Sequence, residues 1–81
     1  MGQIMLRERL EVYSWLVSLY FGEPLLFTNV ESGEYVKVTT SDGNVVIRKF
    51  DAEGVPLKME IVPKKDFNEV LRVLADFVQE I

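Results

Sequence analysis

Aromatic and basic side chains alternate with aliphatic ones between residues 35 and 50. Asp42-Gly43, near the middle of this segment, is a strong signal for a two-residue hairpin turn, because such a turn requires positive φ at both central residues. That turn would put two like pairs on one face of a hairpin, Tyr35 opposite Phe50 and Lys37 opposite Arg48. Planar rings beside positive charges can stack bases and contact phosphates. The segment therefore predicts a site for single-stranded nucleic acid.

A further strand, expected over residues 57–62, would add Lys58 to the same face beside Arg48. Lys37, Arg48 and Lys58 would then form a basic row across the sheet, with the aromatic pair at one end. Stacking contributes about 1–3 kcal/mol per base, whatever the base, and phosphate contacts add a salt-dependent contribution. The predicted nucleic-acid-binding residues are Tyr35, Lys37, Arg48, Phe50 and Lys58, with DNA as the expected ligand and RNA as an open alternative.

Two other interpretations of this face stay open. A Tyr–Phe cross-strand pair stabilises a sheet without any ligand, and exposed lysines are ordinary solvated residues that discourage edge aggregation. The same face is expected to carry the aliphatic residues Leu26, Val30 and Val46, which could instead receive the N-terminal helix or a second subunit. The face is thus a nucleic-acid site, a plain sheet surface or a protein-binding surface.

The residues that most enzymes and metal sites depend on are missing. The chain contains neither Cys nor His, which excludes disulfides and the common zinc sites. A general base near neutral pH would have to be a carboxylate or a lysine with a strongly shifted pKa. Neither a glycine-rich dinucleotide motif nor a phosphate-binding loop is present. We therefore expect a protein that is not an enzyme and that uses no cofactor or metal.

Length and composition predict one domain, over residues 1–81, with a surplus of apolar residues. The chain is 48% hydrophobic, and its net charge of −4 does not suggest a polyanion binder as a whole. Small domains without disulfides or metals often depend on a partner subunit for stability. A homodimer, in which the surplus apolar residues would be buried between the subunits, is therefore one expectation. The alternative function is a homodimeric protein-binding adaptor or chaperone-like module.

The hydrophobic pattern divides the chain into a helix, four strands and a second helix. Polar residues three and four apart predict a helix over residues 3–21, which Gly22 and Pro24 would end. Strands are predicted at about 25–31, 34–40, 45–50 and 57–62, and an amphipathic helix from residue 64 onward. The predicted fold class is α+β: a four-stranded antiparallel meander, in the order α-β-β-β-β-α, with both helices on one face.

Alternation along the strands predicts which side chains the helices cover. Two-residue loops at Ser32-Gly33 and Asp42-Gly43, and a bulged three-residue loop over 52–54, agree on one core face. The strand residues expected on it are Leu25, Phe27, Val36, Val38, Val45, Ile47, Leu57, Met59 and Ile61. They are expected to pack against Phe67, Leu71, Leu74 and Val78 of the C-terminal helix.

The N-terminus lacks a basic region followed by an apolar stretch and a small-residue cleavage site, so no signal peptide is predicted. The apolar segment over 12–27 is interrupted by Gly22-Glu23-Pro24 and is too short to span a bilayer as a helix. We therefore expect a cytoplasmic protein without membrane contact.

From residue 35 to the C-terminus the chain resembles the positive cofactor four class of single-stranded DNA-binding folds. In that class an arginine followed two residues later by an aromatic residue lies on a strand of a four-stranded sheet, and Arg48 and Phe50 match this spacing. The chain differs in two ways. Residues 59–62 read Met-Glu-Ile-Val where the class has a Lys-Lys-Gly element, and a whole helix precedes the sheet.

The complete order of predicted elements is more similar to the ThermoDBP family of archaeal single-stranded DNA-binding proteins. A helix ahead of a four-stranded sheet, a closing helix and no second domain carry this resemblance. The lack of Cys and His suits a hyperthermophile. The resemblance implies that DNA is bound in a hydrophobic cleft flanked by basic residues.

Overall fold

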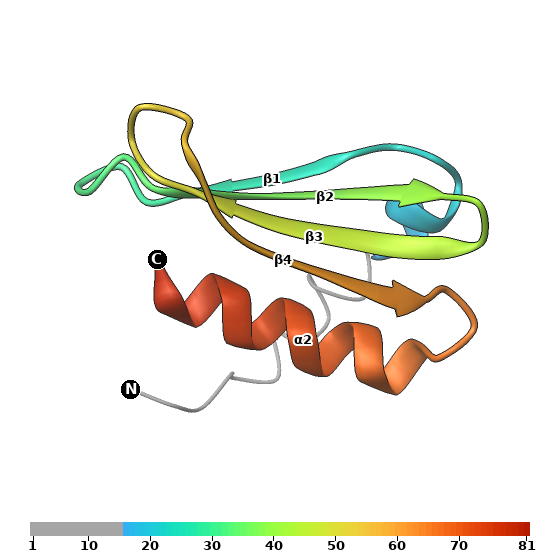
Figure 1. Ribbon diagram of the computed structural model, residues 1–81. Coiled ribbons are helices and arrows are strands. Elements are labelled where there is room, and N and C mark those ends of the chain that lie inside the picture. The colour runs from blue at the N-terminus through green and yellow to red at the C-terminus, as the bar shows by residue number, and fades with distance from the viewer. Residues whose placement is uncertain (1–15) are drawn as a thin grey trace.

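A computed structural model describes residues 16–81 as one antiparallel sheet with helical structure on one side (Figure 1). The elements are β1 (Leu25–Thr28), β2 (Tyr35–Ser41), β3 (Asn44–Phe50), β4 (Pro56–Pro63) and α2 (Phe67–Glu80). The strands lie in the order β1-β2-β3-β4. Residues 16–20 are helical and precede the sheet, and the rest of the helix predicted over 3–21 lies outside the described residues. The predicted α+β meander is confirmed.

The central hairpin has the predicted register. Asp42 and Gly43 have φ angles of 52° and 79°, which is the backbone conformation that a tight hairpin turn requires. Tyr35 consequently pairs with Phe50, and Lys37 pairs with Arg48. The two central strands therefore separate an aliphatic face from an aromatic and basic one, as the sequence predicts.

The first hairpin is shifted by two residues from the prediction. Phe27 pairs with Val36, where a two-residue loop at Ser32-Gly33 would have placed it opposite Val38. The loop is longer because the Asn29 side chain accepts hydrogen bonds from the backbone N–H groups of Glu31 and Ser32, and so draws the chain out of β1. A shift by two residues keeps each side chain on its face. The predicted facing of Leu25 and Phe27 therefore holds.

The last strand has its faces exchanged relative to the prediction. A β-bulge places one extra residue, Leu57, between the pairs Phe50–Pro56 and Lys49–Lys58. One extra residue turns every later side chain to the opposite face. Val62 is therefore the buried residue of β4, while the predicted core residues Leu57, Met59 and Ile61 are 51%, 57% and 54% exposed. Their assignment to the core is wrong.

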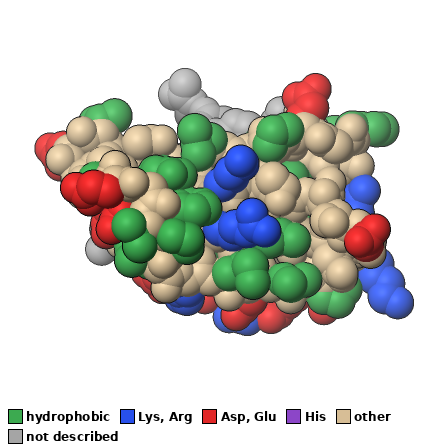
Figure 2. Space-filling model, turned by 45° about the horizontal axis from the view of Figure 1, so that its top comes forward, with side chains coloured by type: hydrophobic (Ala, Val, Ile, Leu, Met, Phe, Trp, Pro, Cys, Tyr) green, Lys and Arg blue, Asp and Glu red, His purple; other side chains and the backbone are tan. Residues whose placement is uncertain are grey.

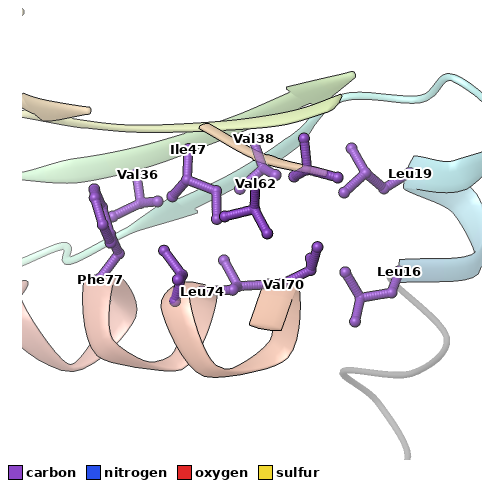
Figure 3. Packing of buried hydrophobic residues seen from close by; sticks show 11 residues of the cluster. Leu16, Leu19, Val36, Val38, Ile47, Val62, Val70, Leu74 and Phe77 are labelled. Carbon is purple, nitrogen blue, oxygen red and sulfur yellow. The ribbon is translucent and has the colours of Figure 1, made fainter. Parts of the chain in front are cut away.

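One apolar cluster holds the sheet, α2 and the N-terminal helical segment together (Figure 3). From the sheet it includes Val36, Val38, Val45, Ile47 and Val62, and from α2 it includes Val70, Val73, Leu74 and Phe77. Leu16 and Leu19 enter the same cluster. Both helical segments therefore lie on the same face, as predicted. The predicted contacts Phe67, Leu71 and Val78 are partly buried at its border.

Polar contacts hold the two ends of α2. The Asp66 side chain accepts a hydrogen bond from the N–H of Glu69 and so caps the first turn. Near that end, the hydroxyl of Tyr20 donates to the carbonyl of Lys64, and Lys64 Nζ donates to the carbonyl of Tyr20 at 2.9 Å. At the other end, the side-chain amide of Asn29 donates to the carbonyl of Ile81. These contacts hold both ends of α2 in place against the rest of the structure.

Truncating a buried leucine of α2 should destabilise the protein far more than truncating an exposed leucine on the opposite face of the sheet. Leu74 is 2% exposed and Leu26 is 63% exposed. We expect Leu74→Ala to lower the free energy of unfolding by about 2–5 kcal/mol, because it removes buried methyl groups and leaves a cavity. Leu26→Ala should change it by less than about 0.5 kcal/mol. Urea denaturation of both variants measures this. Equal losses would contradict the placement of the core.

Candidate nucleic-acid interface

The face of the sheet opposite α2, called here the open face, carries the predicted aromatic and basic residues. Strand pairing places on it Leu26 and Thr28 from β1, Tyr35, Lys37 and Thr39 from β2, Val46, Arg48 and Phe50 from β3, and Met59 and Ile61 from β4. Figure 2 shows basic side chains in the middle of this face and hydrophobic side chains around them. Four of the five predicted site residues are thus brought together.

The aromatic pair forms a stacked unit across β2 and β3. The ring centroids of Tyr35 and Phe50 are 4.8 Å apart, and the ring planes differ by 16°. Each ring uses one face on the other ring, so one face of each remains for another contact. The loop after β3 approaches this pair, since a Cβ atom built at Gly54 would lie 3.4 Å from the Tyr35 hydroxyl. A flat ligand would therefore stack on an outer side of the pair.

A shallow hollow lies beside the pair. It measures about 600 Å³ and is lined by Pro24, Leu25, Leu26, Tyr35, Lys37 and Phe50. Its walls are mainly apolar, with a single ammonium group supplied by Lys37. Such a lining suits a planar ring that carries an anionic group next to it. Pro24 and Leu25 line the hollow where the chain enters β1. Neither residue was predicted from the sequence to belong to the site.

Lys37 and Arg48 are neighbours on β2 and β3. Within residues 16–81 neither side chain forms an ion pair. Two cations side by side without a carboxylate repel each other weakly and leave their hydrogen-bond donors for solvent or for an anion. The pair is therefore available to contact phosphate.

Lys58 does not belong to this face. Its pairing with Lys49 puts it on the helix side, where Nζ lies 2.8 Å from Glu80 Oε2 and 4.6 Å from the centre of the Phe77 ring. The hydrogen bond to Glu80 raises the pKa of Lys58, and the same bond lowers the pKa of Glu80. The predicted basic row of three is therefore wrong: Met59 lies beside Arg48 in place of Lys58.

Sequence reasoning predicted Leu26 and Val46 on the open face but missed the apolar residues that β4 adds to it. Met59 and Ile61 extend it along β4, where they pair with Arg48 and Val46. The only signal for this placement is the bulge, whose position determines whether odd or even residues of β4 face the helices. Val30, which was expected on the face, lies instead in the exposed loop after β1.

Within residues 16–81, no group of three or more acidic side chains could hold a metal ion. No helix described there is long and apolar enough to cross a membrane.

Comparison with known proteins gives no information on the function of this chain. No family model, curated protein or solved structure matches the chain.

The ion pair that captures Lys58 should contribute to stability only where Glu80 is ionised. The pKa of Glu80 is lowered from 4.5 by Lys58, so its contribution is present above the ordinary carboxyl pKa and is lost as pH falls through the lowered value. Glu80→Gln should therefore reduce the free energy of unfolding near neutral pH, and the difference from the unmodified protein should disappear in acid.

Chemical denaturation across a pH series tests this. Glu53→Gln is a suitable control, because the Glu53 side chain makes no ion pair within the described residues. The control should show no pH-dependent difference. A difference for Glu80→Gln that is independent of pH would show that the carboxylate is not held by Lys58.

Proposed function

We propose that this protein binds single-stranded nucleic acid on the open face of its sheet. The observation that carries the proposal is the joint placement of a stacked aromatic pair, an apolar hollow and two cations that form no ion pair within residues 16–81. A base would enter the hollow and stack on the outer side of the Tyr35–Phe50 pair. Lys37 and Arg48 would contact the phosphates that flank this base. Stacking tolerates any base, so the expected recognition is independent of sequence.

Charge shapes how such binding would work. A net charge of −4 does not attract a polyanion from a distance. Affinity would therefore come from short-range contacts and depend on salt only through the phosphates that are neutralised. For two phosphate contacts to a single strand, log K should fall with log salt with a slope of about −1.4. Steeper dependence would require more cations than the described part of the open face provides.

DNA is the proposed ligand and RNA is a second one of the same chemistry, because base stacking and phosphate contacts are available to both. This is also the activity that the resemblance to the ThermoDBP family implies. The proposed protein is a binding module rather than an enzyme, with the cytoplasm as its proposed compartment.

A protein-binding adaptor or chaperone-like module is the second candidate. Leu26, Met59 and Ile61 on the open face are all more than half exposed, which favours an apolar contact with another polypeptide. Lys37 and Arg48 would have no role in such a contact. Sedimentation of the protein with and without oligo-dT separates the two candidates, because only the nucleic-acid binder should sediment with the oligonucleotide.

Removing one cation from the open face should weaken oligo-dT binding, while removing one from the helix side should not. Arg48→Gln is the test and Arg72→Gln is its matched control, since Arg72 lies on α2 and is paired with Glu69 and Asp76. We expect Arg48→Gln to lower the affinity and to reduce the salt slope by about 0.7, the share of one single-strand phosphate. Fluorescence anisotropy at several salt concentrations measures both quantities. Equal effects of the two variants would indicate a response to net charge alone.

Removing the Phe50 ring should cost the stacking energy of one base. Phe50→Ala is expected to weaken oligo-dT binding by about 1–3 kcal/mol. Phe21→Ala is the control, because that ring is 85% exposed but precedes the sheet. The same anisotropy titration serves, with circular dichroism to establish that each variant is folded. Unchanged affinity in the folded Phe50→Ala protein would place the site elsewhere, and no binding by the unmodified protein would end the proposal.

A further inference from the structure

Strand β4 forms an edge of the sheet that the described residues leave unpaired. It is eight residues long and last in the strand order. Seven of its eight residues are exposed, including Leu57, Met59 and Ile61. A long edge strand with apolar side chains is a template for pairing with another strand. Native proteins usually shorten, charge or cover such an edge.

The backbone of β4 determines which groups such a partner would meet. The N–H of Lys64 donates to the carbonyl of Gly43 at 2.9 Å, so this residue points its backbone groups toward β3. Residues of an antiparallel strand alternate in this respect. Glu60 and Val62 consequently point inward, and Met59 and Ile61 point their N–H and C=O groups outward. Pro63, next in the outward series, has no N–H and ends the free edge.

We propose that a second copy of this chain pairs with β4, antiparallel and about a twofold axis at Met59. Each Met59 would lie opposite Met59 of the second copy, with Ile61 opposite Leu57 of the second copy. The outward backbone groups of Met59 would then bond to their equivalents across the axis. The two sheets would become one continuous sheet of eight strands, with α2 of each copy on the same side.

Charge selects this register over its neighbours. With the axis at Met59, Lys58 lies opposite Glu60 of the second copy, and the pairing occurs twice. A register can form hydrogen bonds only if outward-pointing residues of one copy lie opposite outward-pointing residues of the other. The nearest alternative registers therefore place the twofold axis one residue away, at Lys58 or at Glu60. One alternative sets Lys58 against Lys58 of the second copy, and the other sets Glu60 against Glu60. Like charges directly opposite destabilise a strand pair, so the axis at Met59 is favoured.

The charged test uses two single variants and their mixture. Glu60→Lys would set two lysines opposite each other, and Lys58→Glu would set two carboxylates opposite each other. Each variant alone should sediment at the 9.3 kDa of one chain, while the unmodified protein should sediment at twice that mass. An equimolar mixture of the two variants should recover the doubled mass, because every opposing pair in the mixed dimer is then complementary. Loss without recovery in the mixture would overturn the register.

A cross-linking test locates the axis independently. The chain has no Cys, so Met59→Cys introduces a single thiol on the proposed axis. Opposed residues that exchange backbone hydrogen bonds have Cα atoms about 5.5 Å apart, a separation that a disulfide spans. Mild oxidation should therefore join two Met59→Cys chains by a disulfide. Two Ile61→Cys chains should not be cross-linked, because residue 61 lies away from the axis.

A monomeric unmodified protein at all concentrations, or equal cross-linking of the two Cys variants, would refute the dimer. Neither result would affect the proposed function, because Tyr35, Lys37, Arg48 and Phe50 lie on β2 and β3. Oligo-dT titration of the Glu60→Lys variant separates the two proposals directly. It should bind as a single chain if both proposals hold.

Discussion

The two-residue turn between β2 and β3 sets the side on which every other element lies. With positive φ at Asp42 and Gly43, Thr40 pairs with Val45, and strict alternation then sends Val36, Val38 and Ile47 to one face. That face offers a continuous apolar surface, so α2 and the N-terminal helical segment bury their own apolar side chains against it. The aromatic and basic residues are left on the other face by the same constraint. Core and candidate site are thus two results of one register.

This dependence explains what could be predicted from the sequence. A two-residue Asp-Gly turn has few alternative geometries, so the pairing of Tyr35 with Phe50 and of Lys37 with Arg48 could be predicted to the residue. The first hairpin differs by two residues and keeps its faces, because the Asn29 side chain lengthens the loop by an even shift. The bulge at Leu57 adds a single residue, and alternation gives no sign of where one extra residue enters a strand. Lys58 and the apolar residues of β4 were therefore assigned to the wrong faces.

The exchange of faces in β4 places Lys58 with the paired cations of the helix side. On the helix side, Glu80 contacts both Lys49 and Lys58, and Glu69 and Asp76 contact Arg72. On the open face, Lys37 and Arg48 have no ion pair within residues 16–81. Although the net charge of the chain is −4, the described residues thus pair Lys49, Lys58 and Arg72 with carboxylates and leave Lys37 and Arg48 without one. Local pairing, rather than composition, gives this sheet its polarity.

The order of the strands has a consequence for how the chain reaches its structure. Each strand pairs with the one before it in the sequence, so every pairing closes a short loop. Short closures cost little chain entropy, and topologies dominated by such local pairings fold faster than those that join distant segments. The sheet can grow one hairpin at a time from the Asp42-Gly43 turn, and α2 follows directly after the last strand that it covers. The order in which the strands are connected therefore favours fast folding of this protein.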